Sequence, residues 1–132
     1  MQAEDNGYYL KLDENGEYAV WGCYYAHCEN EIGGRDKLDK NTTIFGHSAS
    51  NCDPDGPKFT KLYRYMDADF VKEHPYIYFS EEDTVLTLST CCRKYDNANT
   101  GNQRLVVMAK LLPEGATAQE FSVSLAENPE MP

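Results

Sequence analysis

The sequence has no run of apolar residues close to the ~20 that a membrane-spanning helix needs. Its first residues also lack the pattern of a secretory signal peptide. Positive charge is scarce, with 12 Lys and Arg against 22 Asp and Glu and a net charge of −10. An acidic surface disfavours nucleic acid and anionic lipid as partners, so we predict no nucleic-acid binding.

The composition is that of a globular chain. Its 132 residues suit one domain, and a domain of this size buries enough surface to fold without disulfides or metals. Hydrophobic residues make up 41% and aromatic residues 12%, including ten tyrosines. Tyrosine is favoured in strands, which points toward β structure.

Cysteine is present in an odd number, so at least one of the five thiols is unpaired or pairs between molecules. Cys23, His27 and Cys28 are close enough in sequence to suggest a metal site. A closed zinc site needs four ligands in tetrahedral geometry. We therefore interpret the three as positions along one half-buried strand, and predict neither a metal nor a cofactor.

Short alternating segments separated by turns predict a mostly β domain over residues 1–112. We expect a reduced β-barrel with one or two short helices. Apolar residues at helical spacing predict the helical part over 59–70, and Pro75 ends it. Residues 113–132 are acidic and lack a pattern, so we expect a mobile tail. The predicted strands are 8–12, 18–28, 42–47, 76–79, 84–91 and 104–112, with turns at 13–16 and 53–56.

Cys91 is the candidate nucleophile. Side chains alternate along a strand, so Cys91 falls on the face opposite Leu86 and Leu88. A cysteine that only packed the core would more often share the leucine row. Nucleophilic cysteine acts as a thiolate, and the reference pKa near 8.5 leaves about a few per cent ionised at neutral pH. A neighbouring imidazole can take the proton.

His47 is the histidine best placed to do so. It ends a predicted strand and opens a loop, where rigid scaffolds often display catalytic groups. His27 lies within a predicted strand, where a structural role is favoured. His74 precedes Pro75 at a predicted helix end and suits a solvated or capping role.

An acyl-transfer site also needs a group to hold the developing oxyanion. Arg104 opens the strand 104–112 and shares a row with Val106 and Met108. Such an arginine is more often a solvated edge residue. Arg93 is a competitor two residues beyond Cys91, but a loop would hold it less firmly.

Taken in order, these segments resemble the sortases, and within them class B. The nucleophile segment reads Leu-Thr-Leu-Ser-Thr-Cys over 86–91. The histidine segment reads Thr-Ile-Phe-Gly-His over 43–47, and the arginine segment reads Arg-Leu-Val-Val-Met-Ala-Lys over 104–110. Weaker matches occur at 5–10, 59–65, 69–70 and 76–79, so the resemblance extends over about residues 5–112.

The resemblance implies a cysteine transpeptidase that cleaves the C-terminal sorting signals of surface proteins. For class B members it implies signals of the Asn-Pro-X-Thr type. It implies Cys91 as nucleophile, His47 as general acid and base, and Arg104 as the oxyanion donor. Thr90, Ser89 and Ser48 are candidate substrate-binding residues. A thioacyl-enzyme would be resolved by an amine of the cell-wall precursor or of a pilin lysine. The expected location is the extracellular face of a Gram-positive cell membrane, with the anchor outside this chain.

The chain departs from the family in two places. Before the Tyr-Tyr-Leu segment, which is 8–10 here, the family has an anchor, a helix and a first strand. Between the segment at 76–79 and the strand that ends at Cys91, the family has further strands and a helix-bearing loop. The second segment forms much of the groove that reads the signal. A non-catalytic binding or structural domain, and a thiol hydrolase, therefore stay open as alternatives, and exposed strand edges could pair with another copy. Cys92 lies outside the motif, points away from Cys91, and could pair with Cys23, Cys28 or Cys52.

Overall fold

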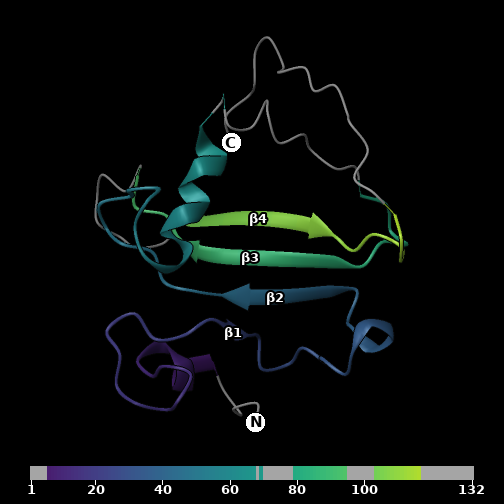
Figure 1. Cartoon of the computed structure of the whole chain (residues 1–132), viewed down its shortest axis with the longest axis horizontal. Coiled ribbons are helices and arrows are strands. Elements are labelled where there is room, and N and C mark those ends of the chain that lie inside the picture. Colours follow the sequence, from purple (N-terminus) through teal and green to yellow (C-terminus); the bar gives the residue numbers. More distant parts are fainter. Residues whose placement is uncertain (1–5, 68, 70–78, 95–102, 117–132) are drawn as a thin grey trace.

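The computed structural model describes residues 6–67, 69, 79–94 and 103–116, and these form one four-stranded sheet (Figure 1). The strand order is β1-β2-β3-β4, with β2 and β3 parallel and the two outer pairs antiparallel. The prediction of a mostly β domain is confirmed, and in the described part of the chain the sheet is open rather than closed into a barrel. The strands are β1 (Tyr25–Ala26), β2 (Asn41–Phe45), β3 (Val85–Cys91) and β4 (Arg104–Lys110).

Three helices have described bounds, and these are of the 3-10 type: η1 (Asn6–Leu10), η2 (Arg35–Lys37) and η3 (Lys58–Met66). Helix η3 confirms the helical segment predicted from residue 59, up to Met66. Of the predicted strand 76–79 only Phe79 is described, and it is not in a strand. Of the predicted tail 113–132, residues 117–132 lie outside the described part of the chain, so its mobility stays a prediction.

Two predicted strands at the N-terminal side are corrected. Residues 8–10 belong to η1 instead, and Leu12 makes only an isolated bridge to Tyr18. The predicted turn closes tightly there, because the Asp13 carboxylate accepts the backbone N–H of Glu17. The predicted strand 18–28 shrinks to β1, because Gly22 adopts a φ of 52° that no extended strand permits.

Helix η3 packs against β4 at one end of the sheet (Figure 1). The rings of Tyr24 and Phe59 lie 4.6 Å apart and close over Gly46, where an added Cβ would come within 2.7 Å of both. Thr60 is fully buried and accepts the N–H of Ala49 at 2.7 Å. This packing fixes the chain that follows β2, where His47 lies. In the part of the chain that the structure describes, the buried apolar residues are Cys23, Ala49, Leu62, Tyr63 and Cys92.

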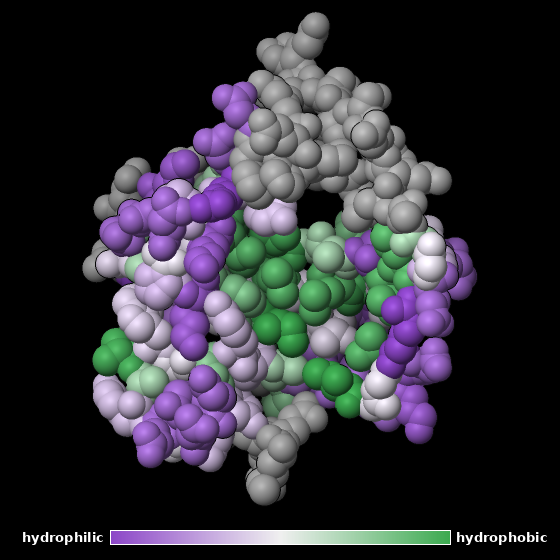
Figure 2. All heavy atoms as spheres, in the orientation of Figure 1, coloured by the Kyte–Doolittle hydropathy of each residue, from purple (hydrophilic) through white to green (hydrophobic). Residues whose placement is uncertain are grey.

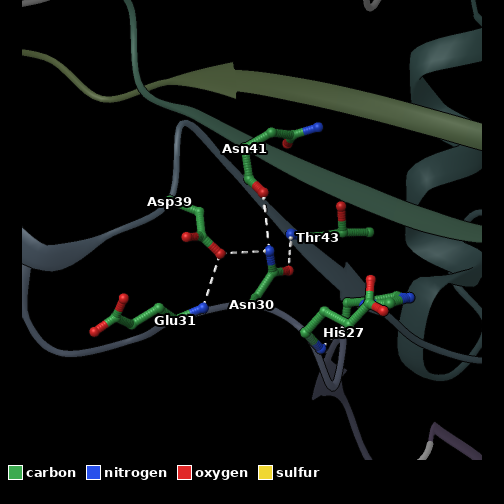
Figure 3. Close-up of polar contacts among 7 residues, drawn as sticks. His27, Asn30, Glu31, Asp39, Asn41 and Thr43 are labelled. Carbon is green, nitrogen blue, oxygen red and sulfur yellow. Dashed lines mark hydrogen bonds and ion pairs between the residues drawn. The ribbon is translucent and has the colours of Figure 1, made fainter.

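Asn30 ties the loop after β1 to β2 (Figure 3). Its amide donates to the Asp39 carboxylate at 2.9 Å and to the Asn41 carbonyl at 3.0 Å. Its side-chain oxygen accepts the N–H of Thr43 at 2.7 Å. The bond from the Asn30 amide, followed by one from the Glu31 N–H, holds the pKa of Asp39 below its ordinary value because both favour the charged carboxylate. The network fixes the start of β2.

Candidate functional site

Three strand ends meet at one end of the sheet (Figure 1). Cys91 ends β3 directly opposite Arg104, which begins β4. On the other side, Phe45 of β2 is in register with Ser89, and the Gly46 N–H continues the ladder by donating to the Ser89 carbonyl at 3.3 Å. His47 therefore follows β2 beside the end of β3. The fold brings the three predicted catalytic residues together, with Cys91 on the middle strand.

Directly opposed residues of an antiparallel pair place their side chains on the same face. Cys91 therefore shares a face with Arg104. Arg104 is exposed, and its guanidinium donates to the Gln103 carbonyl at 3.0 Å. Arg93, the competitor, lies beyond the end of β3, where its backbone N–H donates to the Tyr63 hydroxyl at 3.0 Å. Register thus favours Arg104 as the guanidinium beside Cys91.

The His47 ring is oriented by η1. Its Nε2 lies 3.0 Å from the Leu10 carbonyl. A carbonyl oxygen only accepts, so Nε2 carries the hydrogen of this bond and Nδ1 is the nitrogen that remains for proton transfer. Sequence reasoning did not find this contact, because a backbone carbonyl leaves no residue-type signal.

The Ser48 and Thr90 hydroxyls form hydrogen bonds to backbone carbonyls at the site. Ser48 donates to the Cys91 carbonyl at 2.6 Å, and Thr90 donates to the Gly46 carbonyl at 2.7 Å. Both side chains are buried, as is Ser89. In this structure the two hydroxyls therefore position Cys91 and the segment leading to His47. Substrate binding by Ser48, Ser89 and Thr90 stays a prediction.

Tyr63 is a site residue for which the sequence predicted only a place in the helical segment 59–70. Its hydroxyl donates to the Cys91 carbonyl at 3.2 Å and accepts the Arg93 N–H. Burial, followed by a hydrogen bond with Cys52, raises the pKa of Tyr63 to about 12. The phenol is therefore neutral and able to donate at any physiological pH. It links η3 to the end of β3.

The described residues also bear on metals and membranes. Within residues 6–67, 69, 79–94 and 103–116, no three His, Cys, Asp or Glu side chains lie close enough together to hold a metal ion. Over those same ranges, no helix combines the length and apolar character needed to cross a bilayer. His27 accepts the Glu29 N–H at its Nδ1 and donates its backbone N–H to Thr43, contacts that support the structural role expected for it.

Gly22 lets η1 approach β1, and Gly22→Ala tests how much this approach matters. A Cβ at Gly22 would collide with the Tyr9 carbonyl oxygen and lie 2.8 Å from that of Leu10, the partner of His47. We expect a loss of about 1–3 kcal/mol from the strained φ, plus a further loss from the collision. We also expect altered ¹⁵N shifts of the His47 ring, because the Leu10 carbonyl must move.

Gly16→Ala is the matched control in the same experiment. Gly16 has a φ of 81°, but nothing lies within 4 Å of an added Cβ. It therefore carries the backbone strain without the collision. Thermal unfolding of both variants, with NMR of the His47 ring, separates the two effects. Equal destabilisation and an unchanged His47 ring in both variants would contradict the role given to Gly22.

The architecture and the meeting of these strand ends define a sortase-like fold, and comparisons with known proteins agree. The chain matches the structure of sortase B from Listeria monocytogenes with a TM-score of 0.61 and 22% identity, covering 84% of this chain and 85% of that one. It matches Clostridium perfringens sortase B with a TM-score of 0.63 and 19% identity, covering 83% of each chain. A Staphylococcus aureus sortase B–substrate complex matches with a TM-score of 0.64 and 19% identity, covering 85% of this chain and 72% of that one.

A comparison at the level of sequence also points to sortase B. Sortase B of Listeria monocytogenes serovar 1/2a (strain ATCC BAA-679 / EGD-e) is 37% identical over 75 residues. That match covers 57% of this chain and 28% of the relative, so the aligned part spans less than a third of the relative's length. No family model matches the chain. The chain is a class B sortase-like protein.

Proposed function

We propose that this protein is a sortase-type cysteine transpeptidase. Its substrates would be surface proteins that carry a C-terminal sorting signal. The observation that carries the proposal is the meeting of Cys91, His47 and Arg104 at the adjoining ends of β2, β3 and β4. A thiol, an imidazole and a guanidinium are the groups that a thioacyl transfer needs as nucleophile, proton carrier and oxyanion donor.

The reaction would run in two halves. The Cys91 thiolate attacks the carbonyl carbon of the threonine-like residue, and a C–S bond forms while Arg104 holds the oxyanion. The C–N bond breaks, and the His47 imidazolium gives its proton to the leaving amine. An acceptor amine then attacks the thioester, His47 takes a proton from it, and the Cys91 thiolate leaves. Water in place of the amine would give simple hydrolysis.

The resemblance to sortase B supports the partners as well. We propose that the acceptor is an amine of the cell-wall precursor or a pilin lysine. We also propose that the protein works at the extracellular face of a Gram-positive cell membrane. The Listeria, Clostridium and Staphylococcus relatives are named sortase B. One solved relative carries a substrate and another carries triglycine, which agrees with a signal donor and an amine acceptor.

A second candidate, a non-catalytic sortase-like binding domain, is favoured by the exposed apolar side chains of the sheet. Figure 2 shows apolar side chains gathered at the surface in the middle of the view. On β4, Val106 and Met108 are 48% and 49% exposed on the face that carries Arg104. The resemblance to class B sortases implies that further strands and a loop, which have no counterpart between residues 79 and 84, form much of the wall of the signal groove. An open sheet could still bind a signal peptide without cleaving it.

A quenched peptide panel separates these candidates. The protein is incubated with Asn-Pro-X-Thr and unrelated sorting-signal peptides, with and without triglycine as acceptor. The transpeptidase gives cleavage, a product joined to triglycine, and a thioacyl adduct on Cys91 in the fragment-ion mass spectrum. Cleavage that is unaffected by triglycine indicates a hydrolase. Peptide binding in a fluorescence anisotropy titration, with neither cleavage nor adduct, would overturn the transpeptidase in favour of the binding domain.

A further inference from the structure

The backbone carbonyl of Cys91 points toward the side of β3 on which β2 lies. On the opposite side, the Cys92 N–H donates to the Gln103 carbonyl at 3.0 Å. The backbone polar groups of successive strand residues point to alternate sides, so those of Cys91 point away from β4. However, β2 ends at Phe45, in register with Ser89. The carbonyl of the candidate nucleophile therefore lies beyond the last residue pair of the β2–β3 ladder.

The Ser48 hydroxyl makes the bond that a longer β2 would make. In a parallel ladder, the residues that donate to successive carbonyls are two apart, and so are the residues that carry those carbonyls. The Gly46 N–H donates to the Ser89 carbonyl, so the next pair in the ladder would be Ser48 and Cys91. The Ser48 hydroxyl donates to the Cys91 carbonyl at 2.6 Å. A side chain thus continues the ladder where the strand has ended.

The Tyr63 hydroxyl bonds β3 as one residue of a neighbouring strand would. It donates to the Cys91 carbonyl at 3.2 Å and accepts the Arg93 N–H at 3.0 Å. Along a strand, the carbonyl of one residue and the N–H two residues further on point to the same side, and one residue of a parallel neighbour bonds both. A hydroxyl has both a donor and acceptors, so it can replace both backbone groups.

Helix η3 fixes both hydroxyls relative to each other. Its first residues bond the backbone on both sides of Ser48. The Phe59 N–H donates to the His47 carbonyl at 3.0 Å. The Thr60 hydroxyl accepts the Ala49 N–H at 2.7 Å. The helix that carries the phenol therefore also holds the segment that carries the serine, and the two donors reach one oxygen from a single packed unit.

We propose that Ser48 and Tyr63 are positioning residues whose hydroxyls act together on the Cys91 carbonyl and replace the missing length of β2 beside the nucleophile. A carbonyl oxygen has two lone pairs, and two hydroxyls can use both. Loss of one hydroxyl leaves the other bond in place, whereas loss of both removes the whole substitute for the strand. The two losses should therefore not be additive. The inference rests on the proposed function for its effect on rate, but the anchoring of β3 is measurable without substrate.

The first test is a double-mutant cycle of Ser48→Ala and Tyr63→Phe, followed by peptide cleavage. Each single variant should lower kcat by about two- to tenfold, the effect of one hydrogen bond of ordinary net strength. KM should change less, because both hydroxyls bond the protein's own backbone. The double variant should lose more than the product of the two single losses. A double variant that loses no more than this product would overturn the inference.

The second test is amide hydrogen exchange by NMR, which needs no substrate. Tyr63→Phe removes the acceptor of the Arg93 N–H, so this amide should exchange faster. The Cys92 N–H keeps its bond to Gln103 in every variant. It should nevertheless exchange at least about tenfold faster in the double variant, because the end of β3 opens more often. Unchanged exchange at Cys92 in the double variant would overturn the inference.

Ser50→Ala and Tyr65→Phe are the matched controls. They remove a hydroxyl from the same loop and the same helix, and both residues are exposed. They should leave kcat and the Cys92 exchange rate unchanged, and losses equal to those of Ser48→Ala and Tyr63→Phe would overturn the inference. Thermal unfolding checks that each variant is folded. If the double variant does not fold, Tyr63→Phe decides, and an unchanged kcat in it would overturn the inference.

The two proposals fail in different ways. Faster Cys92 exchange in the double variant of a protein that cleaves no peptide would support the anchoring of β3 and refute the transpeptidase. Peptide cleavage with additive losses and unchanged exchange would refute the anchoring and leave the transpeptidase standing.

Discussion

Cys91→Ala is expected to abolish signal cleavage, whereas Cys92→Ala is expected to retain it. Loss of the nucleophile of a covalent mechanism lowers kcat by at least about a thousandfold, since no other group can form the acyl-enzyme. Cys91 ends β3 opposite Arg104 and beside the segment that carries His47. Cys92 is one residue further, so it points to the other side, and it is buried at 5% exposure.

The pair is a demanding control because the two thiols are neighbours. The backbone N–H of Cys92 donates to the Gln103 carbonyl at 3.0 Å, a bond that alanine preserves. The measurements are kcat/KM on the best peptide of the panel, the adduct mass, and thermal unfolding. Cleavage that survives Cys91→Ala, or that is lost in a folded Cys92→Ala variant, would refute Cys91 as the nucleophile.

The strands that carry the site were predictable because their signals are local. Alternation over 84–91 placed Cys91 opposite the leucine row, and the registers of β3 and β4 agree. Period-two alternation is a property of every extended backbone, whatever the rest of the fold does. The parallel pairing of β2 with β3 brings His47 to Cys91 although the two are far apart in sequence. Residue patterns alone do not encode such a pairing, and only the family resemblance suggested it.

The N-terminal part was predicted poorly for a physical reason. Tyr8, Tyr9 and Leu10 have the composition of a strand, yet they form the 3-10 helix η1. Their role is set by tertiary contacts, the stacking of Tyr9 on Tyr25 and the bond from His47 to the Leu10 carbonyl. Tertiary contacts override weak local propensity. Tyr63 was missed similarly, because a tyrosine in an apolar pattern looks the same whether or not its hydroxyl makes a hydrogen bond.

Arg104→Ala is expected to lower kcat by about 100- to 1,000-fold, the usual cost of removing one oxyanion donor. Arg104→Lys should recover only part of the rate, because lysine keeps the charge but lacks the planar fork of donors. KM should change less than kcat, since the donor acts on a charge that develops only in the transition state. Peptide cleavage kinetics for the three proteins give this comparison.

Arg93→Ala is the control that makes the assignment specific. Arg93 is closer to Cys91 in sequence, yet Arg104 is its direct partner across the β3–β4 ladder, and the Arg93 backbone bond to Tyr63 survives the change. If register selects the oxyanion donor, Arg93→Ala should stay within a fewfold of the parent rate. The reverse result, with Arg93→Ala inactive and Arg104→Ala active, would mean that the loop after β3 supplies the guanidinium. Comparable large losses in both folded variants would instead indicate that the two arginines share the oxyanion, and would contradict a single donor fixed by strand pairing.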